Sequence, residues 1–467
     1  MKNFTDYFSE IRPEKFFLVL AFFFGTLFLL LTPPFQAPDE PNHFYRAWQV
    51  SEGGFMAVKL DSRIGGYLPQ SLAQVAEPFS SMTWNTGQKI TDLPFGDLLK
   101  TPLHPEERKF YDFNNTALYS PVCYLPTSSA ILVCRILDTS PLYTLYWARL
   151  TTLCFWILAV FYVIKIAPFY KWLFSFLALL PMSLFINMSV NADAVTNAIS
   201  FLFIAAVLRS AYHTDSFSNS RFRKLLILIF LLTSIKPAYT PLLLLLLIIP
   251  KTRFKTTKEW LFKIGMLIFS GVLFSALWSV LLNALYLSYQ NYNPGFRDQA
   301  ALVNGADVQQ QLDYILSHGS YLVIVLLSSV KGSFDMYFNG YIGMFGWLEK
   351  SLPLSVVVMT YLLIITVSFY EGGGFIRVYR WHKLIFLFTF LIILFLVFLS
   401  QHLIWDPVGG DLIQNIQGRY LIPAAPLACF LFYGRKEKAK KVAASVTMIS
   451  TVILLAYCVH VLYVRYH

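Results

Sequence analysis

The chain has 467 residues, of which 56% are hydrophobic and only 13% are charged. One or two soluble cores could not bury that much apolar surface, so the composition excludes a soluble globular protein and indicates an integral membrane protein. The formal net charge is +11, but the basic residues gather in short segments between apolar runs, which is typical of membrane topology and not of nucleic-acid binding.

The apolar runs predict an all-α polytopic membrane protein. A helix needs about 20 apolar residues to cross a bilayer, and basic segments favour the cytoplasmic side. With every basic segment inside, the chain alternates out and back through about 11 spans. The basic segments lie at residues 2–15, 165–171, 221–224, 251–258, 377–383 and 435–441. The spans are predicted at residues 16–31, 143–164, 173–188, 194–212, 225–250 (two spans), 260–285, 353–370, 384–400, 421–433 and 442–462.

Four of the apolar runs need an individual interpretation. Residues 16–31 lack a small-x-small site at their end, so we expect a retained helix and not a cleaved signal peptide. Residues 225–250 go out and back, with the break at the "SIKP" that contains Lys236. If residues 122–136 crossed the membrane, every later loop would move to the opposite side and most basic segments would lie outside. Residues 321–330 are too short to cross the membrane. We expect both of these runs to be re-entrant or surface-lying helices.

This topology puts three long segments on the extracytoplasmic side of a single transmembrane domain: residues 33–142, 286–352 and 401–420. Most of the unusual polar residues fall in these segments or in short outer turns. A transporter or channel should instead carry ionisable groups near the middle of its spans. Because the span centres are apolar, we expect a site at the outer membrane surface.

The first outer segment begins "PPFQAPDEPNHFYRAW", which brings two carboxylates, a histidine and an arginine together after the first span. Pro41 suits the first position of a short helix at residues 42–51, which Glu40 would cap, and both Asp39 and Glu40 would then lie at its positive end. His43 and Arg46 follow at helical spacing and are candidates for supporting or substrate contacts. The simpler alternative is a helix cap and a solvated turn.

Further candidates follow along the chain. Asn191 and Asp193 lie in an outer turn, where Asp193 either caps the next helix or contacts an acceptor, a metal or Arg46. Lys236 is costly within an apolar run unless it snorkels or finds a partner such as a lipid phosphate. The remaining candidates are Trp347 and Glu349 as sugar contacts, Gln417 as a substrate contact, and Arg419 as a phosphate ligand or an interface anchor.

Five motifs in order carry a family resemblance: "PPFQAPDEPNHFYRAWQVSEGG", "NADAVTNA", "KPAY", "GYIGMFGWLEKSLP" and "IQGRYLIP". Together they resemble the bacterial membrane-protein family called domain of unknown function 2142, over residues 16–434. That family in turn resembles the GT-C glycosyltransferases, which take a sugar from a polyprenyl-phosphate-linked donor on the extracytoplasmic side. Their first outer loop carries an Asp or Asp-Glu pair, at the position of Asp39 and Glu40 here.

The resemblance implies a GT-C-like glycosyltransferase of the bacterial cytoplasmic membrane, with its active site outside. It would transfer a sugar to a cell-surface or cell-wall polysaccharide or a lipid-linked glycan. Asp39 and Glu40 would be the catalytic carboxylates, and Lys236 and Arg419 would hold the donor phosphate. Two alternatives stay open: a polysaccharide ligase or polymerase with a diphosphate-linked donor, and a lipid or glycan transporter.

The cofactor requirement is also left open. Some GT-C enzymes use a divalent cation such as Mg²⁺ or Mn²⁺ and others use none. Asp39, His43 and Asp193 would be its ligands, although three scattered residues are no metal signature.

Overall fold

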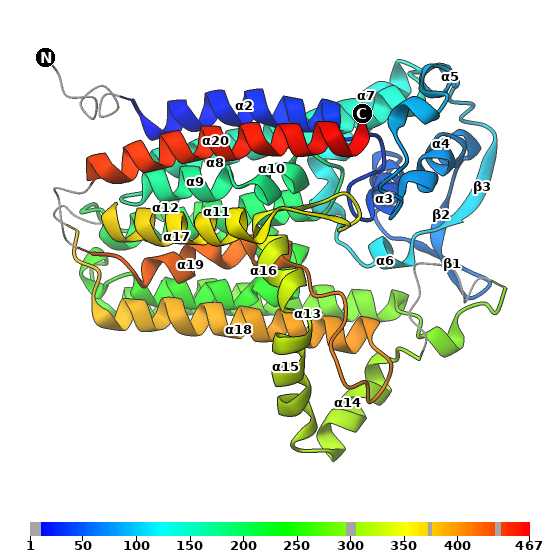
Figure 1. The fold of residues 1–467 in the computed structure, drawn as a ribbon. Coiled ribbons are helices and arrows are strands. Elements are labelled where there is room, and N and C mark those ends of the chain that lie inside the picture. The colour runs from blue at the N-terminus through cyan, green and yellow to red at the C-terminus, as the bar shows by residue number, and fades with distance from the viewer. Residues whose placement is uncertain (1–10, 296–304, 372–375, 435–439) are drawn as a thin grey trace, which may run out of the picture.

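Long helices aligned side by side form the body of the protein in the computed structural model, which describes residues 11–295, 305–371, 376–434 and 440–467 (Figure 1). Within these residues six helices are long and apolar enough to cross a membrane, or up to seven if a bent pair is counted as one span. The six are α2 (Pro13–Leu31), α8 (Pro141–Ile166), α11 (Asp193–Tyr212), α13 (Thr257–Leu285), α18 (Arg380–Trp405) and α20 (Lys440–Tyr466). The protein is therefore a mostly helical, multi-pass membrane protein.

The other predicted spans coincide with shorter or broken helices, so the count of 11 stays a prediction. Proline or lysine interrupts several of them: Pro181 separates α9 from α10, and Lys236 separates α12 from η4. These elements are α9 (Lys171–Ala178), α10 (Pro181–Asn187), α12 (Asn219–Ile235), the 3-10 segment η4 (Pro237–Ile248), α17 (Leu354–Tyr370), the 3-10 segment η7 (Gly418–Ala424) and α19 (Ala425–Phe430).

The predicted break at Lys236 is confirmed. Lys236 is extended, with φ −141° and ψ 112°, between α12 and η4. The backbone N–H of Phe217, before α12, donates to Arg253, after η4, so the two ends of this pair of helices lie together. The chain thus reverses direction at Lys236 and returns to the end of the body where α12 begins.

The segment predicted to be the first outer one follows α2 and collects at one end of the body, which we call the sheet end (Figure 1). The prediction of an all-helical chain was incomplete here, because this segment also contains a small antiparallel sheet. Its strands, in the order β1-β2-β3, are β1 (Val58–Leu60), β2 (Arg63–Pro69) and β3 (Arg108–Asp112), and Gly66 of β2 pairs with Tyr111 of β3. The helices here are α3 (Glu40–Ser51), α4 (Gln70–Ala76), α5 (Phe95–Lys100), α6 (Asn114–Ala117) and α7 (Leu125–Ile136), with short 3-10 turns η1 (Glu77–Met82), η2 (Ile90–Asp92) and η3 (Pro121–Tyr124).

The two apolar runs that the topology kept out of the span count form helices of 12 residues, about 18 Å long, which is shorter than the bilayer core. The first, α7, packs against α8, and the Thr127 and Thr152 hydroxyls share a hydrogen bond of 2.9 Å. The second, α15, meets the preceding α14 at 110° and runs across the direction of the long helices (Figure 1). The elements of the second outer segment are η6 (Tyr289–Asn291), α14 (Val308–Ser317), α15 (Tyr321–Gly332), α16 (Phe334–Ile342), β4 (Met344–Phe345) and β5 (Lys350–Ser351).

The opposite end of the body, which we call the basic end, carries the basic segments before α12 and around η5 (Lys251–Arg253). Lys2, Arg435, Lys436 and Lys438 of the predicted basic segments lie outside the described residues.

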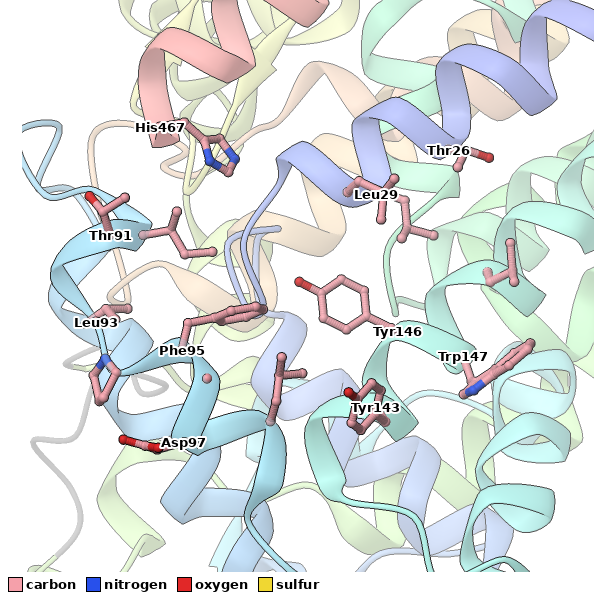
Figure 2. A pocket seen from close by; sticks show the side chains of 16 residues that line it. Thr26, Leu29, Thr91, Leu93, Phe95, Asp97, Tyr143, Tyr146, Trp147 and His467 are labelled. Carbon is pink, nitrogen blue, oxygen red and sulfur yellow. The ribbon is translucent and has the colours of Figure 1, made fainter.

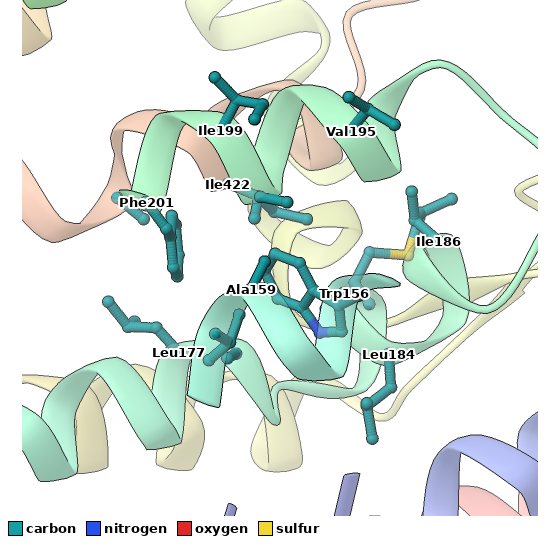
Figure 3. Close-up of a cluster of buried hydrophobic side chains, with 14 of the residues drawn as sticks. Trp156, Ala159, Leu177, Leu184, Ile186, Val195, Ile199, Phe201 and Ile422 are labelled. Carbon is teal, nitrogen blue, oxygen red and sulfur yellow. The ribbon is translucent and has the colours of Figure 1, made fainter. Parts of the chain in front are cut away.

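The core lies between α8, α9, α11 and η7. Trp156 of α8 is fully buried and its ring lies 5.6 Å from that of Phe201 on α11, with Leu177 and Ile422 in the same cluster (Figure 3). Burying such aromatic side chains fixes the helices to one another, so that the sheet-end termini of several helices hold a fixed geometry.

The end of α20 reaches the outer segment as well. Arg465 donates to the backbone carbonyls of Met82 and Gln88 at 2.9 and 3.1 Å, and forms an ion pair of 3.2 Å with Glu349. This one side chain therefore ties the first outer segment to the β4–β5 loop.

Candidate functional site

A cavity of about 260 Å³ lies at the sheet end, where four parts of the chain meet. These are the first outer segment, the start of α11, the β4–β5 loop and the segment from the end of α18 to η7. The cavity brings together Asp39, His43, Asp193, Trp347, Gln417 and Arg419 of the residues predicted from sequence. The other lining residues are Pro38, Trp84, Asn115, Thr116, Tyr119, Leu348, Gln401, Trp405, Asn415 and Tyr420.

Asp39 immediately precedes α3 in a left-handed backbone conformation, with φ 60°. Its carboxylate accepts a hydrogen bond of 3.1 Å from the Asn115 amide and lies 3.5 Å from Nη2 of Arg419, while 34% of the side chain stays accessible. Burial raises the pKa of the Asp39 carboxyl above its ordinary value, against the opposing charge of Arg419. Asp39 is therefore an accessible carboxylate that binds a proton more readily than a solvated aspartate.

Glu40 was expected to cap the helix and to lie beside Asp39 in the site, but it takes a different position. Asp39 occupies the capping position, and Glu40 is the first residue of α3 with its side chain fully buried. Both Glu40 oxygens bind Arg149 of α8, at 2.8 and 2.5 Å, and the Val190 N–H donates to Oε1 at 3.0 Å. Glu40 does not line the cavity. Its role is to fix the start of α3 to α8 and to the turn before α11.

His43 and Arg46, one turn apart in sequence, face different surroundings. His43 lines the cavity, shares a hydrogen bond of 2.7 Å with the Tyr124 hydroxyl and stacks on Tyr119 at 5.6 Å. Burial lowers the pKa of His43 to about 3, so the imidazole is neutral at neutral pH. Arg46 instead donates to Gln49 and to the carbonyls of residues 54 and 55, outside the cavity. Asp193 does not contact Arg46, as one alternative had expected, and pairs with Lys236 and Arg419.

The turn before α11 supplies one site residue and one structural residue. The side chain of Asn191 accepts from the Ala194 N–H at 2.9 Å and donates to the Ile186 carbonyl at 2.5 Å, so it shapes the turn and caps α11. Asp193 begins α11 and forms an ion pair of 2.5 Å with Lys236. Its other oxygen lies 3.6 Å from Nη1 of Arg419.

Lys236 occupies the break between α12 and η4. Its ammonium group lies 4.9 Å from the Tyr119 ring centroid and 5.4 Å from that of Tyr420, in addition to its ion pair with Asp193. The aromatic faces and the carboxylate together hold the charge at the sheet end, away from the hydrocarbon core.

Arg419 is 3% exposed, yet its Nε and Nη1 atoms have no hydrogen-bond acceptor among the described residues. Oε1 of Gln417, two residues earlier, likewise receives no hydrogen bond from any donor among the described residues. A buried guanidinium with unused donors is costly unless a ligand fills them, and its planar fork suits a phosphate or carboxylate.

Tryptophan faces form another wall of the cavity. Trp347 donates from Nε1 to the Phe35 carbonyl at 3.0 Å, and its ring lies 5.8 Å from that of Trp84. Glu349, expected beside it, turns away and pairs with Arg465. Trp347 is thus available for a ring contact, whereas Glu349 fixes its loop.

The proposed cation ligands do not converge. Asp39, His43 and Asp193 share the cavity, but their ligand atoms do not come within the mutual distances of a three-ligand site, and Asp193 already binds Lys236. Among the described residues only His104, Glu106 and Glu107 approach that geometry, and these exposed side chains do not line the cavity. Asp39, His43 and Asp193 therefore do not form a preformed three-ligand cation site.

A second cavity of about 320 Å³ adjoins the first and shares Tyr119, Gln401, Trp405 and Tyr420 with it. It lies between η4, α13 and α18. Lys236 is its charged lining residue, and Ile235, Ala238, Leu282, Val397 and Ile404 supply apolar walls. The charged site thus continues into an apolar space between helices.

A larger cavity, of about 830 Å³, lies elsewhere on the sheet end, between α2, α5 and α8 (Figure 2). Its lining is mostly apolar, with Phe95 and Tyr146 facing each other across it, and contains none of the residues predicted from sequence. It is therefore not the candidate site.

Several contributors were missed from sequence. Asn115, Tyr119 and Tyr124 come from a stretch whose pattern carries no catalytic motif, and only the fold brings them to Asp39 and His43. Arg149 had a usable signal, because an arginine within a predicted span must find a partner.

The family profile described as "predicted membrane protein (DUF2142)" matches residues 22–428. No curated protein and no solved structure matches the chain significantly.

Proposed function

The chain belongs to the DUF2142 family of predicted membrane proteins, and from this premise we propose that it is a membrane glycosyltransferase. It transfers a sugar from a polyprenyl-phosphate-linked donor to a polysaccharide or lipid-linked glycan at the extracytoplasmic face of a bacterial cytoplasmic membrane. Asp39 is the base, and Arg419 with Lys236 holds the donor phosphate.

The observation that carries the proposal is the arrangement of Arg419 and Asp39 across one small cavity. Arg419 is buried with two unused donor atoms, which suits an incoming anion. Asp39 is accessible beside it and has a raised pKa, which suits a group that takes up a proton. Anion binding and proton uptake are the two requirements of transfer from a phosphate-linked sugar.

The adjoining apolar cavity supports a lipid-linked donor over a nucleotide sugar. Its walls of Leu282, Val397 and Ile404 suit a prenyl chain, and Lys236, which also lines it, pairs with Asp193 of the charged cavity. A donor phosphate at Lys236 and Arg419 would then have its chain in the apolar cavity and its sugar toward Trp347. Aromatic faces such as Trp347 and Trp84 pack well on the C–H faces of sugar rings.

The reaction balances with these residues. Asp39 accepts the proton of the acceptor hydroxyl, whose oxygen forms a bond to the anomeric carbon of the donor. The bond from that carbon to the phosphate oxygen breaks, and the polyprenyl phosphate leaves with the electron pair. Arg419 and Lys236 stabilise the negative charge that develops on the phosphate. His43 is neutral and positions Tyr119 and Tyr124 around the base, and Glu40 anchors the helix that follows Asp39.

The test is transfer in membranes or detergent, from polyprenyl-phosphate sugars to a glycan acceptor, with the surface glycan composition of the host as the cellular readout. We expect Asp39→Asn to reduce transfer by about 10²–10⁴-fold, the usual contribution of a general base. The matched control is Asp61→Asn, an exposed aspartate in the β1–β2 turn outside the cavity.

Normal transfer by Asp39→Asn at normal protein level would refute the assignment of the base. An unchanged surface glycan together with donor binding to the wild type would favour the lipid or glycan transporter. Transfer from diphosphate-linked donors alone would favour the ligase or polymerase.

A further inference from the structure

A cavity of about 540 Å³ at the basic end lies between α8, α11 and α12, far from the candidate site. Asp193 and Arg209 stand at the two ends of α11, 16 residues and about 24 Å apart. The apolar walls of the cavity come from all three helices: Tyr162, Ile166, Leu202, Ala206, Leu225 and Leu228. The space therefore lies between the shorter helix α12 and two helices long enough to cross a membrane, α8 and α11, at the basic end of the body.

Three cationic side chains, Arg209, Arg221 and Lys224, line the same cavity. Arg221 is already paired with Asp215, at 2.6 Å. Arg209 and Lys224 have no side-chain hydrogen bond or ion pair within the described residues. Counting Asp215, the local charge is +2, and it comes from groups that stay available to a ligand.

The two observations together define the ligand. A free phosphate would use the cations and leave the apolar walls uncovered, whereas a neutral lipid would cover the walls and leave the cations unpaired. A phospholipid with an anionic headgroup uses both, because its phosphate lies at the membrane surface and its acyl chains extend along the helices. Basic pockets between helices are suited to such headgroups, and the basic end is the side that the sequence predicts to face the cytoplasm.

We propose that this cavity binds an anionic diacyl phospholipid, with its headgroup at Arg209 and Lys224 and an acyl chain between α8 and α12. The lipid fills the gap between three helices of the body and does not depend on the glycosyl-transfer chemistry at the sheet end.

The test is native mass spectrometry of the purified full chain, titrated with phosphatidylglycerol or with phosphatidylcholine of the same acyl chains. We expect the wild type to retain phosphatidylglycerol at least ten-fold better than phosphatidylcholine. The variant Arg209→Gln/Lys224→Gln should lose that preference. The matched control, Arg223→Gln/Lys258→Gln, removes two exposed charges from the same end outside the cavity and should keep it.

A second variant, Leu202→Trp, tests the apolar wall with all charges retained, and should weaken phosphatidylglycerol binding as well. Lys224→Gln alone changes an exposed side chain and gives a folded variant if the double substitution fails to fold. Equal retention of the two lipids by the wild type, or an unchanged preference in both charge variants, would overturn the proposal. Displacement of phosphatidylglycerol by millimolar inorganic phosphate would overturn it too, in favour of a phosphate site.

Discussion

Lys236 donates a hydrogen bond of 2.5 Å to Asp193, from the break between two helices to the first residue of a third. The same carboxylate lies 3.6 Å from Arg419, so one aspartate balances both cations of the candidate phosphate site. The cavity keeps its two positive groups close together before any ligand binds because this carboxylate offsets their repulsion.

Removing the shared carboxylate should destabilise the protein. Asp193→Asn leaves Lys236 and Arg419 buried with less counter-charge, and breaking one side of a buried pair costs about 3–5 kcal/mol. Thermal unfolding in detergent should show a lower Tm than that of the wild type. Asp193→Asn/Lys236→Met should recover part of the loss, since one of the stranded charges is then gone. A double variant no more stable than the single would contradict this account.

The buried pair of Glu40 and Arg149 predicts a stability defect of the same kind. Glu40→Gln should lower the free energy of unfolding by about 3–5 kcal/mol, because the fully buried Arg149 guanidinium loses its bidentate partner. Glu52→Gln serves as a control, since Glu52 is partly exposed and its contacts with Arg108, Arg135 and Trp48 should cost less to lose. Equal loss in the two variants would argue against the anchoring role of Glu40.

The surroundings of Asp39 predict how activity depends on pH. The carboxylate must be ionised to act as a base, and burial raises its pKa, so activity should fall with decreasing pH at a pH above the ordinary pKa of an aspartate. The Asn115 hydrogen bond lowers that pKa. Asn115→Ala should therefore move the acid limb of the rate profile to higher pH, because the ionised carboxylate loses a hydrogen bond. Asn219→Ala, at the basic end, should leave the limb in place.

The depressed pKa of His43 predicts a dependence of stability on pH. The unfolded chain binds a proton at this histidine below about pH 6.5, whereas the folded chain binds it only near pH 3. This contribution to stability is therefore complete above pH 6.5 and is lost as the pH falls toward 3. The difference between the Tm of the wild type and that of His43→Gln should therefore become smaller as the pH is lowered from 6.5 toward 3. A difference independent of pH would show that His43 titrates normally.

The apolar cavity beside Lys236 predicts a dependence on the donor's chain length. Ala238→Trp should fill much of that space and raise the KM for a long-chain polyprenyl-phosphate sugar, with little change for a short-chain analogue. Transfer assays with the two donors, at matched protein levels, measure the difference. An equal rise for both donors would indicate a general distortion of the site.

The sequence predicts the long helices well because their signal is local. Each of α2, α8, α11, α13, α18 and α20 is a long apolar run, and the proline beside Lys236 marks a break that the structure contains. The pairing of β2 with β3 escaped prediction because it joins residues 39 to 47 positions apart. Gly66 against Tyr111 is an example.

In the candidate site, too, the sequence predicted which residues come together but not the partners that lie far away in the chain. Asp39, Asp193, Lys236 and Arg419 were expected on one face, and they meet in one charged cluster. Glu40 looked equivalent to Asp39, but its direction depends on Arg149, 109 residues later, and no local pattern reveals that partner. The expected set of three cation ligands does not converge for a similar reason, since Asp193 begins α11, far in sequence from the α3 region that carries Asp39 and His43.

The Arg465 contacts have a consequence for how the protein is made. The ribosome synthesises the chain from its amino end. The segments that carry Trp84 and Trp347 are therefore made long before Arg465, whose side chain bonds residues close to these two tryptophans. Until α20 is inserted, the outer segment and the β4–β5 loop lack this tie. We therefore expect the site to mature late in biosynthesis, and a nascent chain stalled before α20 to be degraded faster than one stalled after it.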